Sequence, residues 1–429
     1  MRCLLGGGKL SPVARRVAAL SVAAVLALIV ATPTSAATRV NYRAFDDTAP
    51  KTFFNKGGLK LIGQCFGGDA LRIYASTSVD DAMIHANSQG GGSGDEYFEE
   101  DDFDTADGEI ELVGGNFGLD ATDDSSGQIV YGRPGGANVS IDWLAEEGGD
   151  GYSGARDCIF QGTARVVGAG SSGRANFRFD QGQPATTFFS QGGLSLIGTC
   201  TPGGLGVTAR TNTENSMIHA NSQYSGNNQN ALVDNDLDPG ADFFLPNAVN
   251  GTLDNASGQI VYGKPGGNNV TVDWAAEDGG QALGKDCVFN GTARVRKSGD
   301  SLRVNFRVPS GNAGPTTFFS KGGLKLIGQC TSEELTVTAA SGKDFSTVHF
   351  NGQRFGTATE GGNNSFHTDT DDWREIFGDM GLDQDDSSGQ IVHTAYNGTN
   401  VTVRWASEET NGFQDHDCDF IGTAEVGKP

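Results

Sequence analysis

The sequence predicts an all-β protein built from three tandem β-sandwich modules, each with its own disulfide. Trp143, Trp274 and Trp405 recur at equal steps of 131 residues (274 − 143 and 405 − 274), so one module is copied in tandem. Within each copy, apolar and polar residues alternate as they do in strands. Gly-Gly, Pro-Gly and Asn-Gly breaks separate the runs, and 64 glycines leave little room for long helices.

The spacing of cysteine and tryptophan indicates the type of sandwich. In an immunoglobulin domain the tryptophan follows the first cysteine closely. Here Trp143 lies 15 residues before the second cysteine of its copy (158 − 143). We therefore prefer a jelly-roll-like sandwich and keep an immunoglobulin-like sandwich as the alternative.

Residues 1–36 have the features of a secretory signal peptide. Four basic residues and no acid precede an apolar run over residues 17–31, and small residues end at Ala36. The run is too short for a membrane span, which needs about 20 residues. We expect a secreted, extracellular protein that does not insert into membranes.

The repeat boundaries predict β-sandwich modules at residues 37–168, 169–298 and 299–429. A period this long allows each copy to close its own core, so we expect the modules to resemble beads. The linkers are short, so neighbouring modules should touch or sit at restricted angles.

Two cysteines remain in each copy once Cys3 is removed with the signal. Pairing within each copy is favoured, because each module must then fold by itself. Closing loops of this size stabilises a fold by about 4 to 5 kcal/mol in the chain-entropy model. The expected disulfides are Cys65–Cys158, Cys200–Cys287 and Cys330–Cys418.

The segments NVSIDW, NVTVDW and NVTVRW show the strand alternation most clearly. In the first, Val139, Ile141 and Trp143 should point into the core, while Ser140 and Asp142 should point outward. Core packing is the preferred role of the three tryptophans.

The charge of the chain narrows the range of partners. The formal net charge is −23, and removing the four basic residues of the signal makes it −27 (−23 − 4). Such a protein repels nucleic acids and anionic membranes and attracts cations and basic partners.

An acidic pair follows each tryptophan. These carboxylates could bind calcium, act as an acid and base pair, or form an ordinary polar strand end, and the last is preferred. Adjacent strand residues point to opposite faces, so a catalytic pair would need a bulge or loop. The pairs are Glu146 and Glu147, Glu277 and Asp278, and Glu408 and Glu409.

Two further motifs recur and are assigned structural roles. An Asp-rich segment precedes Ser-Gly-Gln in each copy, and such side chains stabilise turns. One histidine per copy, His85, His219 or His349, lies in a strand-like run without an aligned catalytic triad.

Between that histidine and the Asp-rich turn, the copies diverge. The first copy has an acidic segment from Asp95, equally consistent with a binding loop or a disordered insertion, and the third has a short helical pattern from Thr370. In the second copy Asp234, Asp236 and Asp238 alternate, which makes calcium the candidate ion, although the pattern departs from an EF-hand loop.

Three similar modules with divergent loops favour a secreted multivalent binding or surface-structural protein over an enzyme. The ligand is unknown, with a glycan or cell-surface component as the candidate. The alternative is a secreted hydrolase that acts on a polysaccharide through the repeated Glu pairs.

The aspartate pattern yields a prediction for the isolated second module. Calcium should bind with a dissociation constant of about 0.1 to 1 mM, typical of extracellular modules. At 1 mM calcium this adds up to about 1.4 kcal/mol of stability, measurable as a shift in melting temperature. Magnesium at equal concentration is the control. Equal stabilisation by both ions, or a calcium shift that survives Asp236→Asn, would show that there is no such site.

Overall fold

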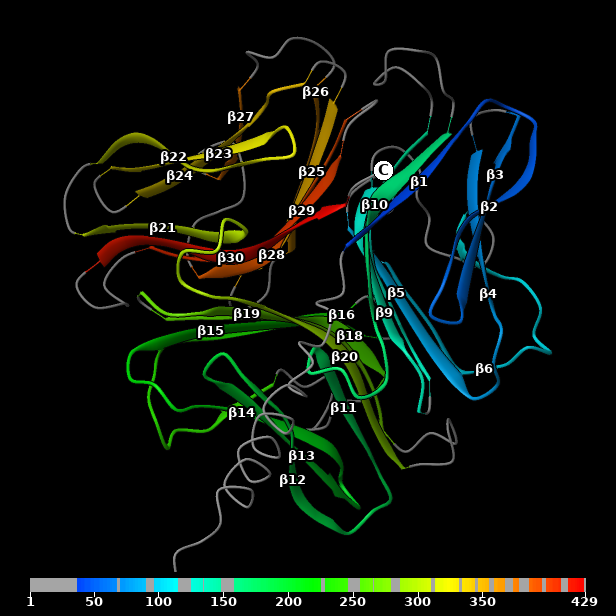
Figure 1. Ribbon diagram of the computed structural model, residues 1–429, viewed down its shortest axis with the longest axis horizontal. Coiled ribbons are helices and arrows are strands. Elements are labelled where there is room, and N and C mark those ends of the chain that lie inside the picture. The colour runs from blue at the N-terminus through cyan, green and yellow to red at the C-terminus, as the bar shows by residue number, and fades with distance from the viewer. Residues whose placement is uncertain are drawn as a thin grey trace, which may run out of the picture. The chain divides into compact units, whose positions relative to one another are not determined.

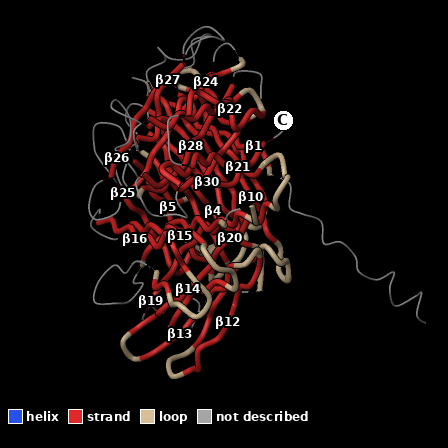
Figure 2. The backbone as a smooth tube through the Cα atoms, turned by 90° about the vertical axis from the view of Figure 1, so that its left-hand side faces the viewer, coloured by secondary structure: helices blue, strands red, loops and turns tan. Residues whose placement is uncertain are grey.

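We describe the fold from a computed structural model of the chain. It describes residues 37–67, 70–89, 96–114, 125–133, 135–147, 158–224, 228–245, 255–264, 266–278, 286–309, 313–331, 334–343, 346–354, 359–366, 373–377, 386–395, 399–409 and 416–427. Over these residues the secondary structure is β-strand and connecting turns, and Figure 2 shows no helix. The all-β prediction is confirmed. The proposed signal segment, residues 1–36, lies outside the described part.

Each module contributes ten described strands in the same order. Module 1 has β1 Thr38–Ala44, β2 Thr48–Lys56, β3 Leu59–Phe66, β4 Ala70–Thr77, β5 Ala82–Gln89, β6 Glu96–Phe103, β7 Ile110–Val113, β8 Ser125–Gly132, β9 Asn138–Glu147 and β10 Cys158–Val167. Module 2 has β11 Arg174–Phe179, β12 Gln183–Gln191, β13 Leu194–Thr201, β14 Gly204–Thr211, β15 Ser216–Tyr224, β16 Asn228–Leu237, β17 Phe243–Phe244, β18 Ala256–Gly263, β19 Asn269–Asp278 and β20 Cys287–Arg296. Module 3 has β21 Arg303–Pro309, β22 Ala313–Lys321, β23 Leu324–Thr331, β24 Glu334–Ser341, β25 Ser346–Arg354, β26 Thr359–Phe366, β27 Trp373–Phe377, β28 Ser387–Ala395, β29 Asn400–Glu409 and β30 His416–Gly427.

The strands of a module form two antiparallel sheets. In module 1 the six-stranded sheet has the order β1-β10-β9-β8-β5-β6 and the four-stranded sheet the order β2-β3-β4-β7. Figure 1 shows β2, β3 and β4 as a layer beside β1 and β10. Modules 2 and 3 repeat both orders. The sandwich prediction is confirmed. Its strand order is dominated by meanders of sequential strands, whereas a jelly roll is built from two Greek keys.

Each sandwich encloses its own hydrophobic core. Separate clusters of buried apolar side chains fill the three modules. Trp143, Trp274 and Trp405 are fully buried in these cores and stack on the phenylalanine of the neighbouring strand, with ring centroids 5.2 to 5.6 Å apart. The predicted core role of the tryptophans is confirmed.

One disulfide links the two sheets of every module. The predicted pairs are formed, with Cα atoms 5.8, 5.8 and 6.0 Å apart, and each joins the third strand of its module to the tenth. Because the cysteines are fully buried, the bonds brace the sandwich from within. Three such bonds indicate an oxidising environment of the extracellular type.

The polar face of the six-stranded sheet does not meet water, and here the sequence-based expectation is wrong. Asn138, Ser140 and Asp142 on β9 are all 0% exposed, as are Asn269, Thr271 and Asp273 on β19. The alternation along the strand correctly predicted which side chains face the core of the module. The other side packs against a neighbouring module instead of solvent.

Equivalent hydrogen bonds connect module 1 to 2, module 2 to 3 and module 3 back to 1. The side chain of Asn138 donates to the carbonyl of Gly291 (2.8 Å), Asn269 to Gly422 (2.8 Å) and Asn400 to Gly162 (2.7 Å). Three hydroxyl pairs follow the same cycle: Ser140–Thr292, Thr271–Thr423 and Thr163–Thr402, at 2.7 to 2.8 Å. The modules therefore form a closed cycle of contacts with approximate threefold equivalence.

Apolar side chains follow this cycle as well. Met83 and Val130 of module 1 cluster with Ala275 and Val288 of module 2. The corresponding clusters are Met217, Val261, Ala406 and Ile421 for modules 2 and 3, and Leu144, Ile159 and Val392 for modules 1 and 3. Residues 36–429 accordingly form one compact unit, in which modules that each have their own core pack closely against one another.

Two local expectations are also corrected. Much of the acidic segment from Asp95 is strand β6, which pairs with β5 at the edge of its sheet and is neither a loop nor a disordered insertion. The helical pattern from Thr370 contains strand β27, which pairs with β24. In both cases a neighbouring strand supplies backbone partners, so tertiary pairing overrides local composition.

Candidate functional site at the junction of the modules

Ionised side chains from all three modules meet where their six-stranded sheets come together. Arg404 on β29 donates from its guanidinium to the carboxylates of Asp142 on β9 and Asp273 on β19. These three residues occupy equivalent positions in the three repeats, and all are 0% exposed. One arginine thus bridges two carboxylates that would otherwise be buried side by side.

A second set of charges surrounds the first. Arg294 on β20 lies 2.9 Å from Glu425 on β30, also contacts Asp273, and donates to the hydroxyl of Ser140 at 3.2 Å. Arg165 on β10 reaches the same Glu425 at 3.1 Å. Arg165, Arg294 and Glu425 are again equivalent positions. The six residues comprise three acids and three arginines, so this charge cluster is neutral overall.

Burial and charge act against each other in this cluster. Burial raises the pKa of Asp142 above its usual value, although Arg404 opposes the shift. For Glu425 burial also favours the neutral acid, but Arg294, Arg165 and Arg404 outweigh it and lower the pKa to about 2. Glu425 is therefore firmly ionised, and the cluster depends on its arginines to keep buried carboxylates charged.

The sequence contains a signal for this cluster that emerges only when the three repeats are compared position by position. Module 3 has Arg404 where the other repeats have aspartate, and Glu425 where they have arginine. Two charge reversals in one repeat that compensate one another indicate that the positions lie close together. Read along single strands, each reversal is only a surface difference, and the sequence-based expectations did not include the cluster.

Each of the repeated histidines has polar partners, and His349 and His219 also contact a neighbouring module. His349 of module 3 approaches Glu146 of module 1, with Nε2 and Oε1 3.4 Å apart. His219 is fully buried, faces Asn235 at 3.2 Å, and has a pKa lowered to about 4 because burial disfavours its charged form. His85 contacts Tyr97 and, at 3.0 Å, Asp101. These partners fit the predicted structural role.

The first carboxylate of each predicted acidic pair is buried. Glu146, Glu277 and Glu408 are 5%, 1% and 3% exposed. Burial raises the pKa of Glu408 to about 8, with Asp386 and Asp419 adding to the shift and Arg307 opposing it. Asp278 is partly buried beside Cys287, and the side chains of Glu147 and Glu409 lie outside the described residues. Their burial does not fit a cleft open to a polymer.

The Ser-Gly-Gln segments also lie at the junction. Asn87, Asn221 and Asn351 donate to Ser257, Ser388 and Ser126 of the next module in the cycle, at 3.0 to 3.2 Å. The residues before these segments form contacts too, since Asn255 donates to Glu99 and Asn235 to Asp386. The motif we assigned to turns therefore holds modules together.

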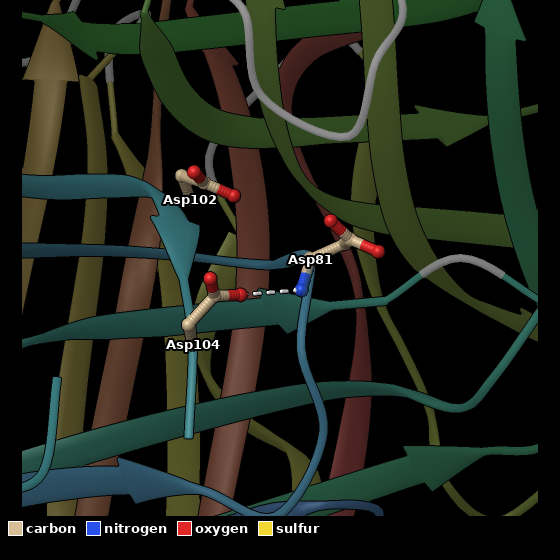
Figure 3. Close-up of side chains that lie close together, drawn as sticks. All are labelled: Asp81, Asp102 and Asp104. Carbon is tan, nitrogen blue, oxygen red and sulfur yellow. Dashed lines mark hydrogen bonds between the residues drawn. The ribbon is translucent and has the colours of Figure 1, made fainter. Parts of the chain in front are cut away.

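Among the described residues, one group of carboxylates is close enough to share an ion. It consists of Asp81, Asp102 and Asp104, whose oxygens lie within 4.8 Å of one another (Figure 3). Asp104, just after β6, accepts a hydrogen bond at 2.7 Å from the backbone of Asp81, which connects the end of β6 to the turn before β5. Burial, with repulsion from its neighbours, raises the pKa of Asp102.

The aspartates predicted to bind calcium are the module 2 counterparts of this region. Asp236 corresponds to Asp102 and Asp238 to Asp104, and Asp238 accepts from the backbone of Asn215 at 3.0 Å. Asp234 accepts from the backbone of Asp236 at 3.0 Å. These bonds give the aspartates a structural role in shaping the strand ends, while calcium binding stays a prediction.

Comparison with known proteins gives no family for this chain. No protein-family model matches it, and a search of curated proteins finds no match either. Within the described residues, no helix has the length and apolar character needed to cross a membrane. The function is therefore inferred from the geometry of the modules.

We expect Arg404→Met to destabilise the protein by about 3 to 5 kcal/mol, because Asp142 and Asp273 would lose their shared partner in the interior. Urea unfolding at pH 7 measures the effect. Arg210→Met is the matched control: its ion pair with Asp242 is exposed, and its loss should have little effect on stability. Adding Asp142→Asn and Asp273→Asn to Arg404→Met should recover part of the loss. Equal stabilities of the Arg404 and Arg210 variants would contradict the bridging role.

We also expect stability to fall as the pH drops from 6.5 to 4. Burial lowers the pKa of both His219 and His393 to about 4. Between these pH values the unfolded chain binds more protons, so each histidine contributes stability above pH 6.5 that is lost on acidification, up to about 3 kcal/mol. Denaturation at pH 7, 5.5 and 4.5 measures the loss. The paired variant His219→Gln with His393→Gln should flatten it, and histidine resonances titrating near 6.5 in the folded protein would contradict it.

Glu408 should have the opposite effect to the histidines and make the protein less stable as the pH rises. Its pKa is about 8 in the fold, so the folded state binds more protons between pH 4.5 and 8, and stability is lost as the pH rises through this range. Glu408→Gln should therefore be more stable than the unsubstituted protein at pH 8 but not at pH 5. Below pH 6.5 the two histidines outweigh this one carboxyl. An unchanged difference between pH 5 and pH 8 would contradict the assignment.

Proposed function

We propose that this chain is a secreted, trivalent binding protein whose three modules are held in one fixed assembly. The observation that carries the proposal is the closed cycle of equivalent contacts, represented by the three Asn-to-Gly carbonyl bonds. A cycle of this kind presents three similar but non-identical surfaces at set positions. Binding to a surface with repeated ligands then gains avidity without flexible linkers.

Two further features support export and binding. The three buried disulfides suit an oxidising compartment, in agreement with the signal-like segment at residues 1–36. The sequence differs most among the repeats between the histidine and the Ser-Gly-Gln segment, which is where ligand preferences would diverge on a common scaffold. A polymer of repeated units, such as a cell-surface glycan, is the class of ligand that three fixed sites suit.

The hydrolase alternative has less support. A glycosidase needs two carboxyl groups that flank the scissile bond. The first members Glu146, Glu277 and Glu408 are all buried, and Glu146 contacts His349 of module 3. Their burial favours a structural role for the pairs.

Retention on insoluble chitin, cellulose and peptidoglycan tests the proposal, with reducing ends assayed in the same tubes. We expect retention on at least one polymer, no release of reducing ends, and binding at least about 100-fold tighter than to its soluble monovalent fragment. Equal affinity for polymer and fragment would contradict trivalency. Release of reducing ends that is lost in the triple Glu146→Gln, Glu277→Gln, Glu408→Gln variant would establish the hydrolase instead.

A further inference from the structure

A polar cavity lies where the three modules meet. Its volume is about 30 Å³, enough for one or two particles the size of a water molecule. Each module contributes an asparagine and a glutamine from equivalent strands, and the described lining contains only neutral residues. The six equivalent residues are Asn87, Asn221, Asn351, Gln128, Gln259 and Gln390.

The side-chain nitrogen atoms of five of these six residues, all except Gln128, donate hydrogen bonds to another module. The Asn nitrogens donate to serine hydroxyls of the next module. Gln259 donates from Nε2 to the carbonyl of Gly389 at 3.2 Å, and Gln390 donates to the carbonyl of Gly127 at 2.9 Å. The side-chain oxygens of Asn87 and Asn221 accept from the backbone N–H groups of Gln128 and Gln259 at 3.1 and 3.0 Å, so the acceptors that remain are glutamine oxygens.

Several of these oxygens have no partner within the described residues. The Oε1 of Gln353 is buried without a hydrogen bond, although its side chain is 5% exposed and lines the cavity. For Gln259 and Gln390, no described residue donates to Oε1. A buried acceptor without a donor destabilises the fold, and among these three oxygens this applies to the Oε1 of Gln353. A ligand that supplies positive charge to oxygen would remove this cost.

We propose that the cavity binds a monovalent alkali cation, Na⁺ or K⁺, through the side-chain amide oxygens of Gln259, Gln353 and Gln390. Neutral carbonyl oxygens replace the hydration shell of such ions in selective sites. The absence of a carboxylate from the described lining disfavours calcium, which prefers charged ligands. The net charge of −23 gives the chain a potential that attracts cations and repels anions.

Thermal unfolding of the purified protein in KCl, NaCl and choline chloride at one ionic strength tests the proposal. We expect KCl or NaCl to raise the melting temperature by about 2 to 5 °C over choline, saturating in the millimolar range. Crystals soaked in RbCl should show anomalous scattering in the cavity, near the Oε1 atoms of Gln259, Gln353 and Gln390.

Substitutions test whether the alkali cation binds in the cavity. Gln353→Met removes an unpartnered oxygen while keeping the side-chain length, and it should weaken the alkali cation by about tenfold, or about 1.4 kcal/mol. Gln64→Met on β3, away from the cavity lining, is the matched control and should leave the affinity unchanged. Equal melting temperatures in all three salts, or water without Rb⁺ in the cavity, would overturn the proposal. The rubidium measurement on the unsubstituted protein decides it even if Gln353→Met does not fold.

Discussion

The structure depends on one constraint, that the six-stranded sheet of each module is buried on both faces while one face is polar. Buried polar groups need partners, and a single module supplies too few for this face. The neighbouring module supplies them through Asn, Ser and Thr side chains in three equivalent sets. Each sheet needs a neighbour, and a cycle is the arrangement in which every module has one and no polar face remains open.

The charge cluster helps to determine which module occupies which position in this cycle. Buried ion pairs add little net stability in general, because desolvation offsets the attraction between the charges. They do penalise wrong arrangements, since three aspartates at the positions of Asp142, Asp273 and Arg404 would repel one another in the interior. In module 3, Arg404 and Glu425 carry charges opposite to those of the equivalent residues in modules 1 and 2. Module 3 is therefore electrostatically complementary to the other two modules. The cluster therefore acts more on which module occupies which place than on total stability.

The sequence predicted the parts of the fold that depend on local pattern and covalent chemistry. Alternation in NVSIDW placed Trp143 in the core, and two cysteines per repeat identified Cys65–Cys158 and its counterparts. It did not predict the junction, because alternation distinguishes the two faces of a strand without saying whether the polar face meets water or protein. The buried Asp142 is therefore indistinguishable, along the strand, from an exposed aspartate. Likewise, the acidity of β6 suggested a loop, since its pairing with β5 is a contact between separate segments.

Tandem duplication solves a problem that this constraint creates. Three separate chains would have to find one another before their polar faces were satisfied, at an entropic cost for each association. Short linkers hold the neighbouring module at a high effective concentration, so the first two contacts become intramolecular steps. The last contact joins module 3 to module 1, where Asn400 donates to the carbonyl of Val40 at 3.0 Å, 360 residues away along the chain. Because this closure removes the remaining open polar face, it should couple the modules into one unfolding unit, even though each contains a complete hydrophobic core and disulfide.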